Sequence, residues 1–276
     1  MTGLPSDFQF SQASLQDYVD CPRRFQLRYV LQLKWPAIEA QPALENERHM
    51  QQGAAFHQLV QRHVLGLQAE ALTRTAHEAD LRRWWHNYLE HGLDDLPDAR
   101  YPEVVLSAPL ASYRLIARYD LVAVGPGRGV IVDWKTNRKR PQRQALAQRL
   151  QTRVYPFLLI EAGAHLNDGQ PFVPQQVEMI YWFADHPHQP ARFPYDAAQY
   201  QADRNDLTAL IEDIAAQGED DYPLTEDARR CTFCPYRSLC QRGVEPGSLD
   251  EAQHEAADLV EGDRQDGIGL DFDLDF

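Results

Sequence analysis

Several features are missing from the sequence, and each absence narrows its possible function. No stretch approaches the roughly 20 consecutive apolar residues of a membrane-spanning helix. The first twenty residues contain neither Lys nor Arg nor an apolar block, so we expect no secretory signal. Only three lysines occur and none follows a glycine, which excludes the phosphate-binding loop of ATP-driven motors. We therefore expect a cytoplasmic protein with no membrane contact and no nucleotide-binding motor of its own.

Basic residues are outnumbered, but most of the acidic excess lies at one end of the chain. The 276 residues include 27 basic and 41 acidic side chains, for a formal net charge of −14. Residues 245–276 contribute −10 of this charge, because they contain eleven acidic residues and one arginine. We predict a disordered acidic tail, since this segment is also broken by glycine. The alternative is that it docks a partner or occupies a basic channel as a DNA mimic.

One cationic segment contrasts with this acidic background. Residues 134–153 contain seven basic side chains and no acidic one. Lys and Arg neutralise the phosphates of nucleic acids, so the segment predicts a DNA-binding surface. A solvated face of an amphipathic helix is the alternative interpretation. The predicted DNA-binding residues are Arg138, Lys139, Arg140, Arg143, Arg149 and Arg153.

Cysteine is scarce, yet three of the four cysteines lie within ten residues. Cys231, Cys234 and Cys240 have the close spacing of metal ligands, and the fourth cysteine is the distant Cys21. Two disulfides or free thiols are the alternative. A single metal centre is favoured, because the chain has no secretory signal and contains a Cys-x2-Cys pair.

The order of apolar patterns predicts an α/β fold with a mixed central β-sheet flanked by helices. Residues 11–33 are expected to be helical, with Ser14 and Asp17 as a capping box and a break at Cys21 and Pro22. The remaining elements are predicted as helices over 51–67 and 70–90, strands between 104 and 132 with a turn over 125–129, a helix over 143–162, a strand over 177–184 and a helix over 197–216. Pro156 is expected to bend the helix over 143–162.

A carboxylate and an ammonium group share one face of the strand predicted to end near residue 135. Successive strand residues alternate faces, so Asp133 and Lys135 project together while Trp134 points the other way. Antiparallel pairing across the glycine-rich turn sets Asp120 beside Asp133. Paired carboxylates suit Mg²⁺ or Mn²⁺, and Lys135 would neutralise phosphate charge or orient the attacking water. An ordinary ion pair at a strand end is the alternative.

The helix predicted over residues 143–162 carries a polar stripe. Gln144, Gln148, Gln151 and Tyr155 recur at steps of three and four residues and so lie on one face. His57 lies in another predicted helix among apolar residues, where a core or surface role is the alternative to metal binding.

Taken together, these residues resemble the ordered motif set of the PD-(D/E)XK nucleases of the RecB type. The segment from Ser14 to Phe25 and the late cysteines further resemble the iron–sulfur branch, which includes the AddB nuclease domain and the CRISPR-associated adaptation nucleases. The resemblance covers approximately residues 8–242. Its motifs, in chain order, are His57, Asp120, Asp133-x-Lys135 and Gln151-x3-Tyr155.

The resemblance implies a fold, a set of ligands and catalytic roles. The fold is a restriction-endonuclease-like core in one domain over residues 8–242, with residues 8–35 and 222–242 as a metal-cluster subdomain. His57, Asp120 and Asp133 would bind Mg²⁺ or Mn²⁺, with Lys135 as the catalytic lysine. Gln151 and Tyr155 would support the lysine and the substrate. One 4Fe–4S cluster, or zinc as the alternative that four thiolates also suit, would be held by Cys21, Cys231, Cys234 and Cys240.

Three functional hypotheses follow. The first is a divalent-metal-dependent DNA nuclease, more an exonuclease than an endonuclease, that acts on DNA ends or single strands in repair, recombination or defence with a helicase or other partner. The second is a non-catalytic DNA-end-binding subunit of a helicase–nuclease or CRISPR adaptation complex. The third is a metal-bearing structural module without a nucleic-acid role.

Overall fold

A five-stranded sheet forms the centre of the structure. The computed structural model describes residues 4–33, 43–218, 222–231 and 234–243. Strands β6 and β7 pair in parallel, and the other neighbouring strands of this sheet pair antiparallel. In spatial order the strands are β2 (Ala99–Pro102), β5 (Leu121–Gly125), β6 (Arg128–Lys135), β7 (Val177–Phe183) and β8 (Ala191–Pro194).

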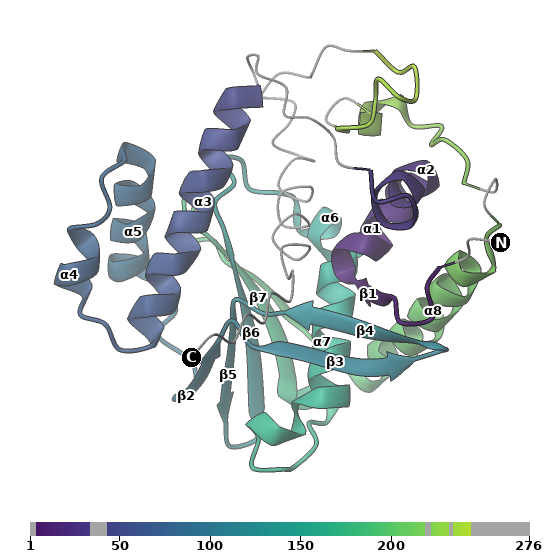
Figure 1. The fold of residues 1–276 in the computed structure, drawn as a ribbon. Helices are drawn as coiled ribbons and strands as arrows, with labels where there is room; N and C mark the ends of the chain where they lie inside the picture. Colours follow the sequence, from purple (N-terminus) through teal and green to yellow (C-terminus); the bar gives the residue numbers. More distant parts are fainter. Residues whose placement is uncertain (1–3, 34–42, 219–221, 232–233, 244–276) are drawn as a thin grey trace, which may run out of the picture.

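A three-stranded sheet lies beside the central sheet (Figure 1). Its strands, in spatial order, are β1 (Gln9–Ser11), β4 (Tyr113–Arg118) and β3 (Val105–Leu110). The middle strand β4 pairs in parallel with β1 and antiparallel with β3.

Two apolar clusters cover the opposite faces of the central sheet. One face packs on α3 (Ala43–Val64), α4 (Ala69–Thr73) and α5 (Ala79–His91), with Trp134 and Trp182 among the buried residues. The other face packs on α7 (Leu150–Ala162), on the three-stranded sheet and on α8 (Ala197–Ala216). Residues that alternate along β6 therefore enter different cores, which is the alternation expected of a strand buried on both faces.

The beginning of the chain folds into short helices next to the second sheet. They are α1 (Gln12–Asp20), α2 (Pro22–Phe25) and the π-helix η1 (Gln26–Val30). The predicted interruption at Cys21 and Pro22 is confirmed, because Cys21 is extended and Pro22 opens α2. The predicted capping box is wrong. Ser11 caps α1 and exchanges hydrogen bonds with Ser14, three residues earlier than expected.

Two predicted long helices are each divided in two. The expected helix over residues 70–90 is α4 and α5, with a loop between them. The expected helix over residues 143–162 is α6 (Arg143–Gln148) and α7, separated by the extended Arg149. Pro156 lies inside α7, which continues through it, so the interruption falls at Arg149 and not at the proline.

Strands β1, β2 and β8 were not predicted, whereas several other elements follow the prediction closely. The turn between β5 and β6, strand β7 and helix α8 lie where the sequence places them, and short 3₁₀ turns η2 (Gly163–Leu166), η3 (Pro174–Gln176) and η4 (Ala228–Cys231) connect others. The predicted α/β fold class is confirmed. No helix among the described residues is long and apolar enough to cross a membrane. The predicted acidic tail lies outside the described residues.

Candidate active site

Three polar side chains form a closed triangle at the end of β6. The Lys135 Nζ lies 2.8 Å from Asp133 Oδ2, and both side chains are buried. Gln151 Nε2 donates to Asp133 Oδ1 at 2.6 Å, and Lys135 Nζ donates to Gln151 Oε1 at 3.1 Å. Gln151 therefore contacts both charged groups, and α7 fixes their positions relative to one another.

The alternation along β6 places this triangle on the face that packs against α7. Trp134 points to the opposite face, where its ring lies 5.6 Å from the rings of both Trp182 and Tyr88. Buried charges are stable only when they are paired and hydrogen-bonded, and here Lys135 and Gln151 supply both kinds of partner to Asp133. The predicted shared face of Asp133 and Lys135 is confirmed.

Asp120 lies across from Asp133, directly before β5. The register pairs Leu121 with Val132, which brings Asp120 to the neighbouring position on the adjacent strand. Asp120 Oδ2 accepts the Trp134 N–H at 2.8 Å, and its Oδ1 lies 3.1 Å from His57 Nδ1 on α3. Burial raises the pKa of Asp120, but His57, the Trp134 N–H and Lys135 together lower the pKa below its ordinary value.

The lowered pKa of Asp120 makes a testable contribution to stability. Because the folded-state pKa is depressed, this contribution is present above the ordinary carboxyl pKa of about 3.9 and is lost as the pH falls through the folded-state value. Asp120→Asn is therefore expected to be less stable than the wild type at neutral pH, by a margin that narrows below about pH 4. Urea unfolding at a series of pH values measures this, and a margin independent of pH would contradict it.

Tyr155 lies in the core one turn beyond Gln151. Its ring lies 4.7 Å from the ring of Tyr119, and its backbone carbonyl accepts the Tyr119 hydroxyl at 2.9 Å. Tyr155 thus anchors α7 to the connection between β4 and β5, which carries Asp120.

Tyr181 is a site residue that the sequence analysis missed. It pairs with Asp133 in the parallel register of β6 and β7, and its ring centroid lies 5.4 Å from Lys135 Nζ. Its hydroxyl lies 2.7 Å from Thr152 Oγ1, which itself donates to the Leu146 carbonyl at 2.6 Å. Thr152 has one proton to donate, so Tyr181 donates to Thr152. In the sequence Tyr181 is indistinguishable from its apolar neighbours, because only the parallel register brings it to Lys135.

Tyr181 is expected to stabilise the buried ammonium of Lys135 through its ring. Tyr181→Phe keeps the ring and loses one hydrogen bond, so it is expected to lower the free energy of unfolding by about 1 kcal/mol. Tyr181→Leu removes the ring as well and is expected to cost at least about 2 kcal/mol, with a larger loss of any activity that depends on Lys135. Denaturant unfolding of the two variants measures the difference, and equal losses would contradict a role for the ring.

The family model described as the PD-(D/E)XK nuclease superfamily matches residues 9–241. The chain belongs to the PD-(D/E)XK nuclease superfamily. No curated protein matches it. Eighteen chains of solved structures match, among them the one described as "Crystal structure of SSO0001", with 14% sequence identity, 86% of this chain and 87% of that chain covered, and a TM-score of 0.39.

Members of the PD-(D/E)XK superfamily typically use Mg²⁺ or Mn²⁺, and the donors at this site fit such an ion chemically. Asp120 and Asp133 offer carboxylate oxygens on adjacent strands, the ligand type that hard cations prefer. His57 Nδ1 lies 3.1 Å from Asp120 Oδ1, so the imidazole adds a nitrogen donor next to this carboxylate. Within the described residues, no three His, Cys, Asp or Glu side chains are arranged to hold a metal ion.

The basic residues that the sequence predicts to bind DNA lie in different surroundings. Arg138, Lys139 and Arg143 are exposed, and Arg143 stacks 4.4 Å from the Phe193 ring centroid. Arg153 instead forms ion pairs of 2.5 Å with Asp203 and Asp206 of α8. Arg140 donates to the Gln189 carbonyl, and Arg149 occupies the break between α6 and α7.

The break at Arg149 also divides the predicted polar stripe. Gln144 and Gln148 of α6 are exposed, whereas Gln151 of α7 is buried in the triangle with Asp133 and Lys135. The stripe is therefore two separate surfaces, and only its second half reaches the charged pair.

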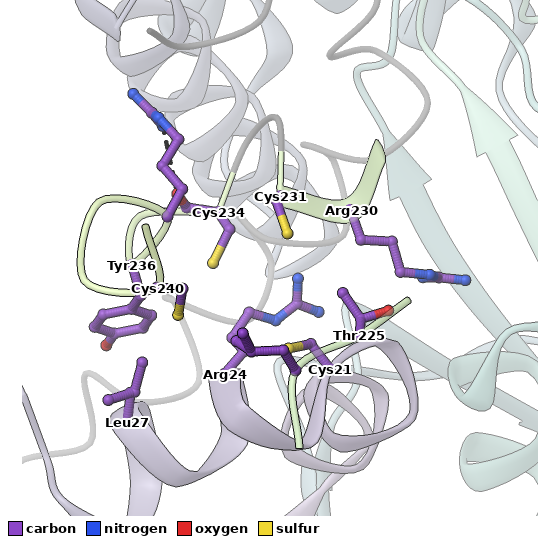
Figure 2. Close-up of a pocket in the computed structure, with 11 residues that line it drawn as sticks. Cys21, Arg24, Leu27, Thr225, Arg230, Cys231, Cys234, Tyr236 and Cys240 are labelled. Carbon is purple, nitrogen blue, oxygen red and sulfur yellow. Dashed lines mark hydrogen bonds between the residues drawn. The ribbon is translucent and has the colours of Figure 1, made fainter. Parts of the chain in front are cut away.

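A second site lies between the two ends of the domain. Figure 2 shows a pocket into which Cys21, Cys231, Cys234 and Cys240 direct their sulfur atoms. All four are free thiols, and the same pocket is lined by Arg24. Arg24 forms ion pairs of 2.8 Å with Asp17 and with Asp20, both on α1.

Burial controls the protonation of this cysteine pocket. Loss of hydration raises the pKa of Cys231 and Cys240 and raises the pKa of Cys234 to about 11. These thiols are protonated at neutral pH in the absence of a cation, so a metal must displace their protons to bind. Sulfur is the donor type that a 4Fe–4S cluster or tetrahedral zinc takes, although within the described residues the thiols are not already arranged to hold a metal ion.

Proposed function

We propose that this protein is a divalent-metal-dependent deoxyribonuclease that hydrolyses phosphodiester bonds at DNA ends or in single strands. Membership of the PD-(D/E)XK superfamily supports a nuclease that binds DNA. The observation that carries the proposal is the arrangement of Asp120, Asp133 and Lys135 at one strand end, with Gln151 joined to two of them. The exposed Arg138, Lys139 and Arg143 follow directly after β6 and would contact the DNA backbone.

Each residue of the site has a role that its contacts allow. Asp120 and Asp133, with His57, would hold Mg²⁺ or Mn²⁺, which when bound polarises a phosphoryl oxygen and lowers the pKa of water. Lys135 would place its ammonium against the developing negative charge of the phosphate. Gln151 holds Lys135 and Asp133 through separate atoms, so it keeps the ammonium beside the carboxylate while substrate binds.

The cleavage test uses labelled single- and double-stranded DNA with Mn²⁺ or Mg²⁺. We expect cleavage that EDTA stops and that Asp133→Ala abolishes. Arg114→Ala is a matched control, because its exposed side chain bonds Ser107 on the second sheet, away from the triangle. Cleavage that survives EDTA or Asp133→Ala would contradict the proposal. Free 3′ and 5′ ends compared with circular DNA test the exonuclease assignment.

A second candidate, a non-catalytic subunit that binds DNA ends, has one observation in its favour. Asp133 is engaged by Lys135 and Gln151, and the described residues contain no preformed group of three metal-binding side chains. This candidate predicts salt-sensitive DNA binding without cleavage in any divalent metal. The nuclease predicts both binding and metal-dependent cleavage.

We further propose that the protein belongs to the RecB-like iron–sulfur branch and works in the cytoplasm with a helicase or other repair or defence protein. The convergence of four cysteines on one pocket from both ends of the domain supports this. A 4Fe–4S cluster is the favoured occupant and zinc the alternative. Counting iron, sulfide and zinc in anaerobically purified protein, together with its visible absorption, decides between them.

A further inference from the structure

The first residue of α7 is held by a side chain from another element. α7 begins at Leu150, and the side chain of its N-cap residue Arg149 does not cap the helix. The Leu150 N–H instead donates to Gln16 Oε1 on α1, at 3.3 Å. The first N–H groups of a helix have no partner within the helix, so an external acceptor fixes where the helix begins.

Gln16 is itself held from the other side. Its Nε2 donates to Asp20 Oδ1 at 2.9 Å. Asp20 is buried and forms ion pairs with Arg24, at 2.8 Å, and with Arg230. Arg24 and Arg230 both line the cysteine pocket (Figure 2). A continuous series of polar contacts therefore runs from the pocket through Asp20 and Gln16 to the start of α7.

The first turn of α7 also carries Gln151, the residue that joins the two charged groups of the active site. Gln151 directly follows Leu150 and contacts both Asp133 and Lys135. A shift of the first turn of α7 moves the Gln151 amide directly, because a helix transmits displacement along its backbone. Displacement of a catalytic group by about 1 Å is enough to lower a reaction rate by roughly 10²-fold.

We propose that Gln16 is a positioning residue for the active site. Its side-chain oxygen fixes the first residue of α7 and thereby holds Gln151 between Asp133 and Lys135, while Asp20 orients the Gln16 amide from the edge of the cysteine pocket. The proposal rests on the proposed nuclease function only for its catalytic consequence. Its structural part concerns the Leu150 amide and is measurable without activity.

Hydrogen exchange of the Leu150 amide in the full-length protein tests the structural part. Gln16→Leu removes the acceptor at nearly constant size and is expected to speed this exchange roughly fivefold. Gln16→Glu keeps an acceptor for the Leu150 N–H but loses the hydrogen bond to Asp20 and places a second carboxylate beside it, so exchange is expected to speed up less than in Gln16→Leu. Val19→Ser, an exposed position on the same helix, is the matched control. Unchanged exchange in Gln16→Leu, or equal acceleration in both Gln16 variants, overturns the proposal.

A double-variant comparison tests the catalytic part. Gln16→Leu is expected to lower kcat about tenfold while the KM for DNA stays nearly constant, and Gln16→Glu, which keeps the acceptor but not the bond to Asp20, is expected to lower kcat less. In a Gln151→Ala background, Gln16→Leu is expected to add less than about a twofold loss, because both changes act through the same amide. Losses that multiply overturn the proposal. A wild-type protein that cleaves no DNA refutes the nuclease function and leaves the exchange measurement as the test of Gln16.

Discussion

Replacing Lys135 with methionine is expected to abolish DNA cleavage and to lower the free energy of unfolding by about 3–5 kcal/mol. The ammonium lies 2.8 Å from Asp133 Oδ2 in a buried site, so its removal leaves a buried carboxylate without this cation. Cleavage is expected to fall at least about 10²–10³-fold, the usual effect of losing a group that stabilises transition-state charge. Urea unfolding and a labelled-DNA assay with Mn²⁺ measure the two effects.

The double variant Asp133→Asn with Lys135→Met separates stability from catalysis. Removing both charges takes away the uncompensated carboxylate, so stability is expected to return to within about 1–2 kcal/mol of the wild type while cleavage stays absent. Lys139→Met serves as the control for stability, because this exposed lysine lies just beyond β6. A double variant as unstable as Lys135→Met would refute the buried-pair explanation, and wild-type cleavage by Lys135→Met would refute the catalytic role.

Replacing Cys234 with alanine is expected to abolish binding of the metal proposed for the cysteine pocket and to lower Tm by more than about 10 °C. Cys234 is buried, packs with Leu27 and Tyr236, and shares the pocket with three other thiols. Metal uptake is also expected to weaken as the pH falls, because burial raises the thiol pKa values and each thiol must lose its proton to bind.

Leu239→Ser is the matched control for this prediction. It changes a residue of the same segment whose side chain is 49% exposed. Metal content by elemental analysis and Tm by calorimetry provide the measurements. Unchanged metal content in Cys234→Ala would show that the pocket does not hold the metal, and unchanged Tm would show that the pocket does not stabilise the domain.

The parts of the fold that the sequence predicts are those set by local patterns. The glycine-rich turn fixes the antiparallel pairing of β5 and β6, so the position of Asp120 relative to Asp133 could be read from the chain. Strand alternation likewise placed Asp133 and Lys135 on one face. Helix α8 has the predicted bounds because Asp196 caps its N-terminus by accepting the Gln199 N–H and the segment has no competing break.

The parts that could not be predicted depend on contacts between distant segments. The break at Arg149 has no signal in the residue type, whereas Pro156 carries the strongest helix-breaking signal and yet lies inside α7. Arg153, which is predicted to contact DNA, forms ion pairs with Asp203 and Asp206 of α8, and the sequence does not reveal these partners. The loop between α4 and α5 contains neither glycine nor proline, so the sequence carries no signal for its position.

The second sheet was missed for the same reason. Its strands β1 and β4 pair in parallel although about a hundred residues separate them, with Phe10 opposite Leu115. Parallel pairing leaves no turn between the partners to mark it in the sequence. The contact of Lys135 with Tyr181 depends on the other parallel pair, β6 and β7, and was equally invisible.

The placement of the cysteine pocket has a consequence for biosynthesis. Cys21 leaves the ribosome early, but Cys231, Cys234 and Cys240 are translated only after every strand and helix of the core. A growing chain therefore carries a lone thiol near its beginning and has no complete set of four ligands until translation has passed residue 240. Insertion of a cofactor that needs all four sulfurs is consequently a late maturation step, and chains truncated before that point are expected to remain unloaded.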